Sequence, residues 1–346
     1  MILPLCWRLR TKGHLLEAAC RYRYSRRDFT SGHVSKGLSV QASGDTLAYQ
    51  YINGESSVSD KYSKRSTCVM VHGMLGQGKN LRSFARRIVR KYPFFDVLLV
   101  DLRGHGKSPR SFPNAKFNSV ENCAVDLYNL FDTLEIEPDV LIGHSFGGKV
   151  ATAFIKHSIE VGDGVLPRTW VWDSVIGNFD PSVLPKHNST MQVLEALKGL
   201  ETPIKSRNLI KHFESYDISP GIMNWMMTNL VVNPAEPGTY LWAFDLECCI
   251  ELFESYCKTD LSDLFEHLPL VDQFPKPETP ILNFVRAGGN LVWNENCLEA
   301  MNEACGNAPI GQVAIHDVPD VGHWVHVEAP ELVFDLLERN TLTKFV

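Results

Sequence analysis

The chain has 346 residues, a formal net charge of −6 and 44% hydrophobic residues, with 24 glycines and 19 prolines scattered along it. This is the composition of a globular protein with a full core, and it excludes a small disulfide-stapled scaffold. The charge offers no broad basic surface for nucleic acid, and no apolar run reaches the about 18 to 20 residues that span a bilayer. The nine cysteines form no Cys-x-x-Cys pair, which favours free thiols over a zinc site.

Residues 1–36 differ from the rest of the chain. They hold eight basic and two acidic residues, a local net charge of +6, with leucines that fall on one side of a helix. An Arg-rich, acid-poor, amphipathic segment without an apolar stretch of secretory type is typical of an organellar transit peptide. Because the segment is rich in arginine and contains few serines, it favours targeting to the mitochondrion over targeting to a plastid. The alternative is a basic tail on a cytoplasmic protein.

Apolar runs bounded by turn residues follow, and they are predicted to be strands: 38–43, 46–52, 67–72, 96–101, 139–143, 168–173, 280–285 and 312–318. Stretches with helical periodicity lie between several of them, at 80–91, 118–135, 145–159 and 328–339. Strands that alternate with helices indicate an α/β fold, in which a mostly parallel central sheet carries helices on both faces.

About 105 residues separate the sixth and seventh predicted strands, which is too long for a plain loop. Apolar residues recur there at helical spacing, so we interpret 176–275 as a helical cap inserted after the sixth strand, within a core formed by 37–175 and 276–346. Aromatic and methionine side chains of this cap, Trp225 and Trp242 among them, are candidates for an acyl pocket or for plain core.

The strongest chemical signal is Gly143–Gly147, which reads Gly-His-Ser-Phe-Gly between a strand and a helix. At such a strained turn the serine hydroxyl is exposed at the carboxyl edge of the sheet, and a Cβ at either glycine would collide with the neighbouring strand or helix. Ser145 is therefore the candidate nucleophile. The N–H of Phe146, at the start of the helix, points where an oxyanion would form.

A serine nucleophile requires a base held by an acid. His323, in Gly322–Trp324 after the last strand, is the candidate base. Asp173 ends the sixth strand at the same sheet edge and is the favoured acid. The loop after the next strand is the more common place for the acid, but it contains only Glu295, and Glu247 in the cap is a third possibility.

A second oxyanion donor is expected from the loop after the strand at 67–72. The sequence His72–Gly76 fits, because glycine lets the backbone turn sharply so that the N–H of Met74 faces the site. One such donor typically contributes about 3 to 4 kcal/mol of transition-state stabilisation.

Four motifs together resemble the α/β-hydrolase fold: His72–Gly76, Asp101–Ser108, Gly143–Lys149 and Gly322–Trp324. Gly147–Lys149, Gly288–Asn290 and Gly322–Trp324 are similar in particular to the abhydrolase-domain-containing protein eleven group and its bacterial esterase relatives. The resemblance implies a cofactor-free serine hydrolase of ester or thioester bonds, with mitochondrial members. The bacterial relatives point to the position of Asp173 for the acid, whereas an aspartate sometimes assigned in the cap corresponds to Glu247.

Other functional classes fit less well. Gly73–Asn80 nearly matches a nucleotide-binding loop, but Asn80 lacks the hydroxyl that would hold Mg²⁺. No His-Glu-x-x-His motif or cysteine pair suggests a metal. The remaining alternative is a non-turnover ligand receptor or interaction protein on the same fold. The sequence therefore predicts a serine esterase, lipase or thioesterase that acts on a small-molecule acyl substrate.

Overall fold

The computed structural model describes residues 39–40, 46–54, 65–112, 117–162, 166–183, 190–269 and 279–345. Residues 36–346 form one compact unit. The predicted transit segment, 1–36, lies outside the described residues. No helix among the described residues is long and apolar enough to cross a membrane.

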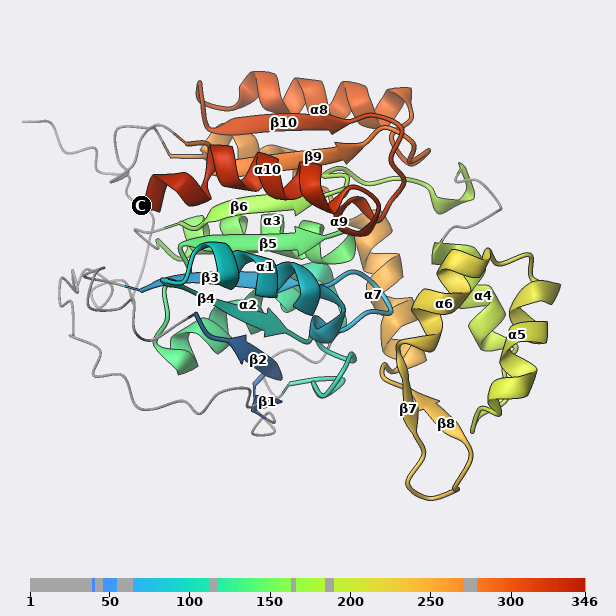
Figure 1. Cartoon of the computed structure of the whole chain (residues 1–346). Coiled ribbons are helices and arrows are strands. Elements are labelled where there is room, and N and C mark those ends of the chain that lie inside the picture. Colours follow the sequence, from blue (N-terminus) through green and yellow to red (C-terminus); the bar gives the residue numbers. More distant parts are fainter. Residues whose placement is uncertain are drawn as a thin grey trace, which may run out of the picture. The chain divides into compact units, whose positions relative to one another are not determined.

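The eight predicted strands form one sheet, in the order β1-β2-β4-β3-β5-β6-β9-β10 (Figure 1). Its strands are β1 (Ser39–Val40), β2 (Tyr49–Ile52), β3 (Ser66–Val71), β4 (Phe95–Val100), β5 (Val140–His144), β6 (Arg168–Trp172), β9 (Leu282–Ala287) and β10 (Val313–Val318). β2 runs antiparallel to both of its neighbours, and every other pair is parallel. The mostly parallel sheet is therefore confirmed.

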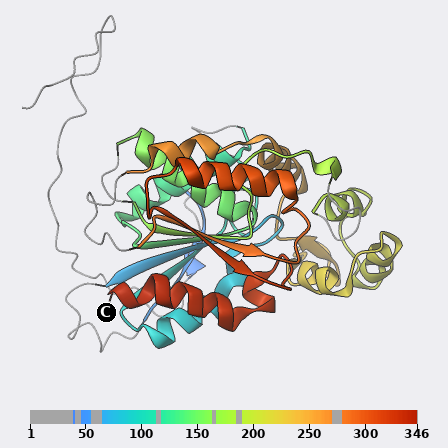
Figure 2. The ribbon, with the colours of Figure 1, turned by 90° about the horizontal axis from the view of Figure 1, so that it is seen from above.

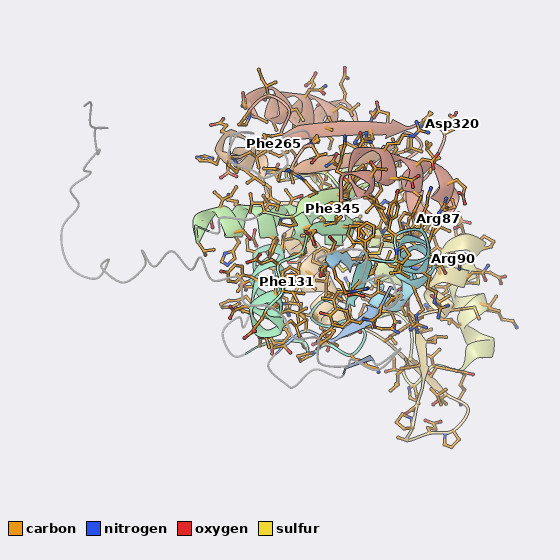
Figure 3. All side chains as sticks on the ribbon, turned by 60° about the vertical axis from the view of Figure 1, so that its left-hand side comes forward. Arg87, Arg90, Phe131, Phe265, Asp320 and Phe345 are labelled. Carbon is orange, nitrogen blue, oxygen red and sulfur yellow. The ribbon has the colours of Figure 1, made fainter. Side chains whose placement is uncertain are left out.

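Helices cover both faces of the sheet (Figure 2). The main ones are α1 (Arg82–Lys91), α2 (Val120–Leu134), α3 (Phe146–Glu160), α8 (Glu295–Asn307) and α10 (Pro330–Asn340), with the short α9 (Val325–Glu328) before α10. One apolar cluster includes α2, α3 and α8, and a second lies under α1 and α10. Phe131, Phe265 and Phe345, labelled in Figure 3, belong to or pack against these clusters.

The segment between β6 and β9 is mainly helical, as predicted. It contains α4 (Thr190–Lys198), α5 (Ser206–Ser215), α6 (Pro220–Met227) and α7 (Leu246–Lys258), with short 3₁₀ turns at Pro181–Val183 and Ser262–His267. It also contains a hairpin, β7 (Leu230–Val232) and β8 (Tyr240–Trp242), which we did not predict. Figure 1 shows α4 to α6 and the hairpin beyond the arrowheads of the central strands.

Helix ends follow the local chemistry of the sequence. Ser119 caps α2 by accepting a hydrogen bond from the Asn122 N–H at 3.1 Å, and Asp245 caps α7 through the Cys248 N–H at 2.8 Å. Asn294 caps α8 in the same way. We did not predict α8, because it buries only Met301 and Ala304 and so shows little apolar periodicity.

The junction of β5 and α3 requires two residues without side chains. A Cβ on Gly143 would lie 2.1 Å from the Gly147 carbonyl oxygen, and one on Gly147 would lie 2.4 Å from the His72 carbonyl oxygen. Both neighbours are backbone atoms, which cannot swing aside. Close packing of β5, α3 and the end of β3 thus explains why glycine flanks the predicted elbow on both sides.

Replacing Gly143 with alanine is expected to lower the free energy of unfolding by about 3 kcal/mol, because the new methyl group overlaps the backbone of α3. Urea unfolding of the purified variant measures this. Gly221→Ala is the matched control: Gly221 is an exposed residue of α6 with no atom near its Cβ position, so alanine should be neutral or stabilise by about 0.5 kcal/mol. Equal unfolding midpoints for the two variants would contradict the steric argument.

Candidate active site

Ser145 occupies the turn between β5 and α3 with a φ of +53° and a ψ of −121°. An L-residue rarely adopts this backbone conformation, and such strain persists only where the surroundings enforce it. The Ser145 N–H donates to the Trp172 carbonyl oxygen at 2.8 Å, and the Ser145 carbonyl oxygen accepts from the N–H groups of Gly148 and Lys149. The backbone is thus fixed on both sides, while the side chain caps nothing.

His323 and Asp173, from loops 150 residues apart in the chain, are in direct contact. His323 Nδ1 lies 2.7 Å from Asp173 Oδ2. Because a carboxylate accepts, Nδ1 carries the proton and Nε2 is left with its lone pair, as a general base requires. Asp173 has a φ of +52°, so both it and Ser145 adopt left-handed backbone conformations at the carboxyl ends of adjacent strands.

The Asp173 carboxylate is fully buried and accepts further hydrogen bonds from the chain around β9. Oδ1 accepts from the Ala287 N–H at 2.9 Å and from Trp293 Nε1–H at 2.7 Å, and Oδ2 also accepts from Asn290 Nδ2–H at 2.5 Å. Donors to the charged form stabilise a buried carboxylate in its ionised state. We did not predict Asn290 or Trp293. The sequence did offer one indication: the loop after the seventh strand, where an acid is more common, carries the amide Asn290.

The two alternative acids lie in other surroundings. Glu247 is exposed in the first turn of α7, and its Oε2 accepts from Arg110 Nη1 at 2.8 Å. Glu295 is the first residue of α8. Within the described part of the chain, neither carboxylate is hydrogen-bonded to a histidine.

A second histidine supports the backbone of His323. His144 Nε2 lies 2.9 Å from the His323 carbonyl oxygen, so Nε2–H is the donor, and the two rings are 4.8 Å apart. Burial, together with the neighbouring His326 and His323, holds the pKa of His144 well below its ordinary value of 6.5. A neutral His144 places no positive charge beside His323, where such a charge would weaken the base.

The candidate oxyanion loop, 72–76, is held by two more buried histidines. His72 Nε2 accepts from the Leu102 N–H at 3.0 Å, and His105 Nε2 accepts from the Leu75 N–H at 3.1 Å. Both acceptor roles require neutral imidazole, and burial lowers the pKa of His72 to about 4 and that of His105 to about 3. Leu75 has a φ of +61°, and the Gly76 N–H closes a turn onto the Gly73 carbonyl oxygen.

The N–H groups of Ser145 and Leu75 both donate hydrogen bonds. The N–H groups of Phe146 and Met74, the two predicted oxyanion donors, have no hydrogen-bond acceptor among the described residues. Phe146 is the first residue of α3, so its N–H is one of those that a helix leaves unsatisfied. Met74 lies between Gly73, whose carbonyl oxygen accepts from the Gly76 N–H, and Leu75, whose N–H donates to His105. An ideal Cβ on Gly73 would lie 3.2 Å from Ser145 Cβ, which places this loop directly against the serine.

A groove of about 370 Å³ opens between the inserted segment and the core, where Lys79, Asn80 and Arg82 line its core side. On the side of the inserted segment the groove is lined by Trp225 of α6 and by Thr228, which directly follows α6. Trp324, in the same loop as His323, lines the groove from the core. The rings of Trp225 and Trp324 are 5.7 Å apart. Three other methionine and aromatic side chains of the inserted segment, Met223, Met226 and Phe244, are buried in the apolar core. No group of three metal-ligating side chains gathers anywhere in the described ranges.

Comparison with known proteins agrees with this architecture. Residues 68–336 match the model of the alpha/beta hydrolase family. The chain is 26% identical over 297 residues to the sn-1-specific diacylglycerol lipase ABHD11 of Mus musculus, covering 84% of this chain and 83% of the relative. It is 23% identical to the esterase YbfF of Escherichia coli, covering 83% of this chain and 98% of the relative.

Among solved structures, a marine microorganism esterase superimposes with a TM-score of 0.65 at 19% identity, covering 85% of this chain and 99% of that one. Sequence match, relatives and fold thus agree, and the resemblance to ABHD11 and the bacterial esterases is confirmed. The chain belongs to the α/β-hydrolase family.

Proposed function

We propose that the protein is a serine hydrolase that cleaves a carboxylic ester or thioester through an acyl-enzyme, with Ser145, His323 and Asp173 as its triad. The observation that carries the proposal is the 2.7 Å contact between His323 and the buried Asp173, which follows the strand adjacent to the one that ends at the strained turn of Ser145. The relatives named as a diacylglycerol lipase and an esterase support the ester-hydrolysing class.

In the first step, Ser145 Oγ attacks the acyl carbonyl carbon while His323 Nε2 takes its proton. Asp173 accepts from Nδ1–H and stabilises the imidazolium that forms. The N–H groups of Met74 and Phe146 hold the oxyanion of the tetrahedral intermediate, and because they belong to fixed backbone they need no rearrangement when charge develops. His323 then protonates the leaving group.

In the second step, His323 activates a water molecule that attacks the acyl-enzyme, and Ser145 regains its proton as the acid product leaves. None of these steps involves a cofactor. A serine at this turn, rather than an aspartate, also favours acyl transfer over dehalogenation or epoxide opening.

The groove lined by Trp225 and Trp324 favours a substrate with an apolar portion. The two rings pack against each other, 5.7 Å apart, and Trp324 directly follows His323, so a substrate would lie along this aromatic wall. Ligand sites of this kind combine an apolar wall with a few convergent polar groups. We propose a small-molecule ester or thioester with an apolar acyl or leaving group as the substrate class.

Replacing Ser145 with alanine tests the nucleophile. The full chain should react with a fluorophosphonate probe and turn over p-nitrophenyl esters, and Ser145→Ala should lose the labelling and about 10,000-fold in kcat. Rising acyl length across the ester panel reports the substrate preference. A folded wild type that neither labels nor turns over would favour the receptor alternative on the same fold.

Replacing Asp173 with asparagine tests the acid. We expect kcat to fall by about 1,000- to 10,000-fold, because the amide favours the wrong tautomer of His323. Glu247→Gln and Glu295→Gln should change kcat by less than about threefold, since an exposed ion pair such as Glu247 with Arg110 contributes little. A larger loss from either glutamate would move the acid to that position.

A double variant sharpens this test. Asn290 Nδ2 lies 3.2 Å from His323 Nδ1, so Asp173→Asn combined with Asn290→Asp exchanges the carboxylate and its amide donor. Part of the activity lost in Asp173→Asn should return, by about tenfold. A double variant no better than Asp173→Asn would mean that the carboxylate acts only from position 173.

We also propose that residues 1–36 direct the protein to the mitochondrion. The support is their basic, acid-poor and amphipathic sequence. A fluorescent reporter fused to residues 1–36 should enter mitochondria, and the same fusion with its arginines changed to glutamine should not. A diffuse cytoplasmic signal, or a plastid signal in a plant cell, would overturn the assignment.

A further inference from the structure

Lys149 is a buried cation on the helix that begins after Ser145. It lies in the second turn of α3 and is 1% exposed, whereas Lys156, on the same helix, reaches the surface and pairs with Asp263. A lysine is rarely buried to this extent unless its charge has a structural purpose. The chemistry proposed for the site makes no use of Lys149.

The ammonium of Lys149 donates to main-chain carbonyl oxygens from both ends of the inserted segment. Nζ lies 2.9 Å from the Gly177 oxygen, 2.8 Å from the Tyr256 oxygen and 3.0 Å from the Thr259 oxygen. Gly177 follows β6, where the chain leaves the core, and the other two end α7, where it returns. Carbonyls at a helix C-terminus lack helical donors and carry partial negative charge, so they suit a three-donor cation.

The surroundings keep this cation charged at neutral pH. Nζ lies 4.5 Å from the centre of the Tyr256 ring and 5.9 Å from that of Phe179. Burial lowers the pKa of Lys149 to about 8, and the carboxylates that face it, Asp260 after α7 and Glu121 of α2, act in the opposite direction. Cys257 of α7 and Cys297 of α8 also face it, but burial raises the pKa of both thiols, so they are neutral at pH 7.

The two ends of the insertion also touch each other beside Lys149. The Leu261 N–H donates to the Ile176 oxygen at 3.1 Å, and the Phe179 N–H donates to the Cys257 oxygen at 2.9 Å. A Cβ on Gly148 would lie 2.9 Å from Ser174 Cβ, so a glycine is needed before the lysine for the departing chain to pass this close. Gly148 and Lys149 thus serve one junction.

The opposite end of α7 is fixed to the loop that supports the candidate oxyanion donors. The Asp245 N–H donates to the Gly104 oxygen at 2.7 Å, and the Gly106 N–H donates to the Ala243 oxygen at 2.6 Å. Between these glycines, His105 accepts from the Leu75 N–H. α7 therefore has one end on the oxyanion side of the site and the other on the helix that follows Ser145, and Figure 1 shows it between the sheet and α4 to α6.

We propose that Lys149 is a positioning residue, whose ammonium clamps both ends of the inserted segment to the Ser145 helix and so sets where α7, and the inserted segment that continues from it, lie relative to that helix. The structural part of this proposal is independent of the reaction. Its consequence for substrate binding rests on the proposed serine hydrolase function.

Hydrogen–deuterium exchange of the full chain tests the clamp without any assay of activity. In Lys149→Met, which keeps the length of the side chain but removes the charge, amides of 174–179 and 254–261 should exchange about tenfold faster. Lys156→Met removes a surface charge from the same helix and should leave both segments at wild-type rates. Unchanged exchange in a folded Lys149→Met would overturn the proposal, as would faster exchange spread evenly over the chain.

Ester kinetics test the consequence for the groove. For p-nitrophenyl octanoate, Lys149→Met should raise KM by about tenfold with kcat within about twofold, because the binding surface moves while Ser145, His323 and Asp173 stay in place. Titration of the active sites with the fluorophosphonate probe corrects kcat for any loss of folded protein. A KM equal to that of the wild type would then contradict the positioning role.

A pH series with the wild type covers the case in which Lys149→Met does not fold. Above about pH 8 the neutral amine has only two donors for three carbonyls, so exchange at 254–261 should rise beyond its ordinary pH dependence, measured on α2. A constant ratio of the two regions from pH 7 to 9 would contradict the proposal. If the wild type hydrolyses no ester and binds no fluorophosphonate, the proposed function fails, while the exchange experiments still decide the clamp.

Discussion

A carboxylate that is withdrawn from water must be surrounded by hydrogen-bond donors, and the region around Asp173 supplies them from separate parts of the chain. Its donors are the backbone of β9, the side chains of Asn290 and Trp293 in the loop after β9, and His323 in the loop after β10. These segments meet because β6, β9 and β10 are neighbouring parallel strands whose carboxyl ends share one edge. The strand order is thus the constraint on which the candidate site depends.

Neutral histidines form the rest of the polar frame. His72, His105 and His144 each use ring nitrogens on backbone groups, and burial lowers the pKa of each, so the frame carries no positive charge of its own at neutral pH. Aliphatic side chains could not bind these backbone groups, and lysines would bring charge beside His323. Neutral imidazole therefore combines hydrogen bonding with a weak electrostatic effect on the proposed base.

The sequence was sufficient to predict the sheet and to place Ser145 and Asp173 at the carboxyl ends of adjacent strands. Buried parallel strands are recognisable as apolar runs. The glycines on either side of Ser145 are required because a Cβ there would lie only 2.1 to 2.4 Å from a backbone oxygen. The hairpin β7–β8 and helix α8 were missed, since both are half-exposed and carry weak periodicity. The donors to Asp173 were missed for another reason: an asparagine or tryptophan in a loop has no pattern that reveals which buried carboxylate it serves.

The role of Lys149 was also not recognisable from the sequence. In the sequence it is one residue of a Gly-Gly-Lys motif, and a lysine on a helix is ordinarily assigned to the surface. Its role becomes visible only when the carbonyls of Gly177, Tyr256 and Thr259 are brought around one ammonium. Because α7 is fixed at both ends, substitutions on α6 that face the groove can alter the groove while the segments that hold Asp173 and His323 keep their own contacts. The fold thereby separates the residues proposed to select a substrate from those proposed to react with it.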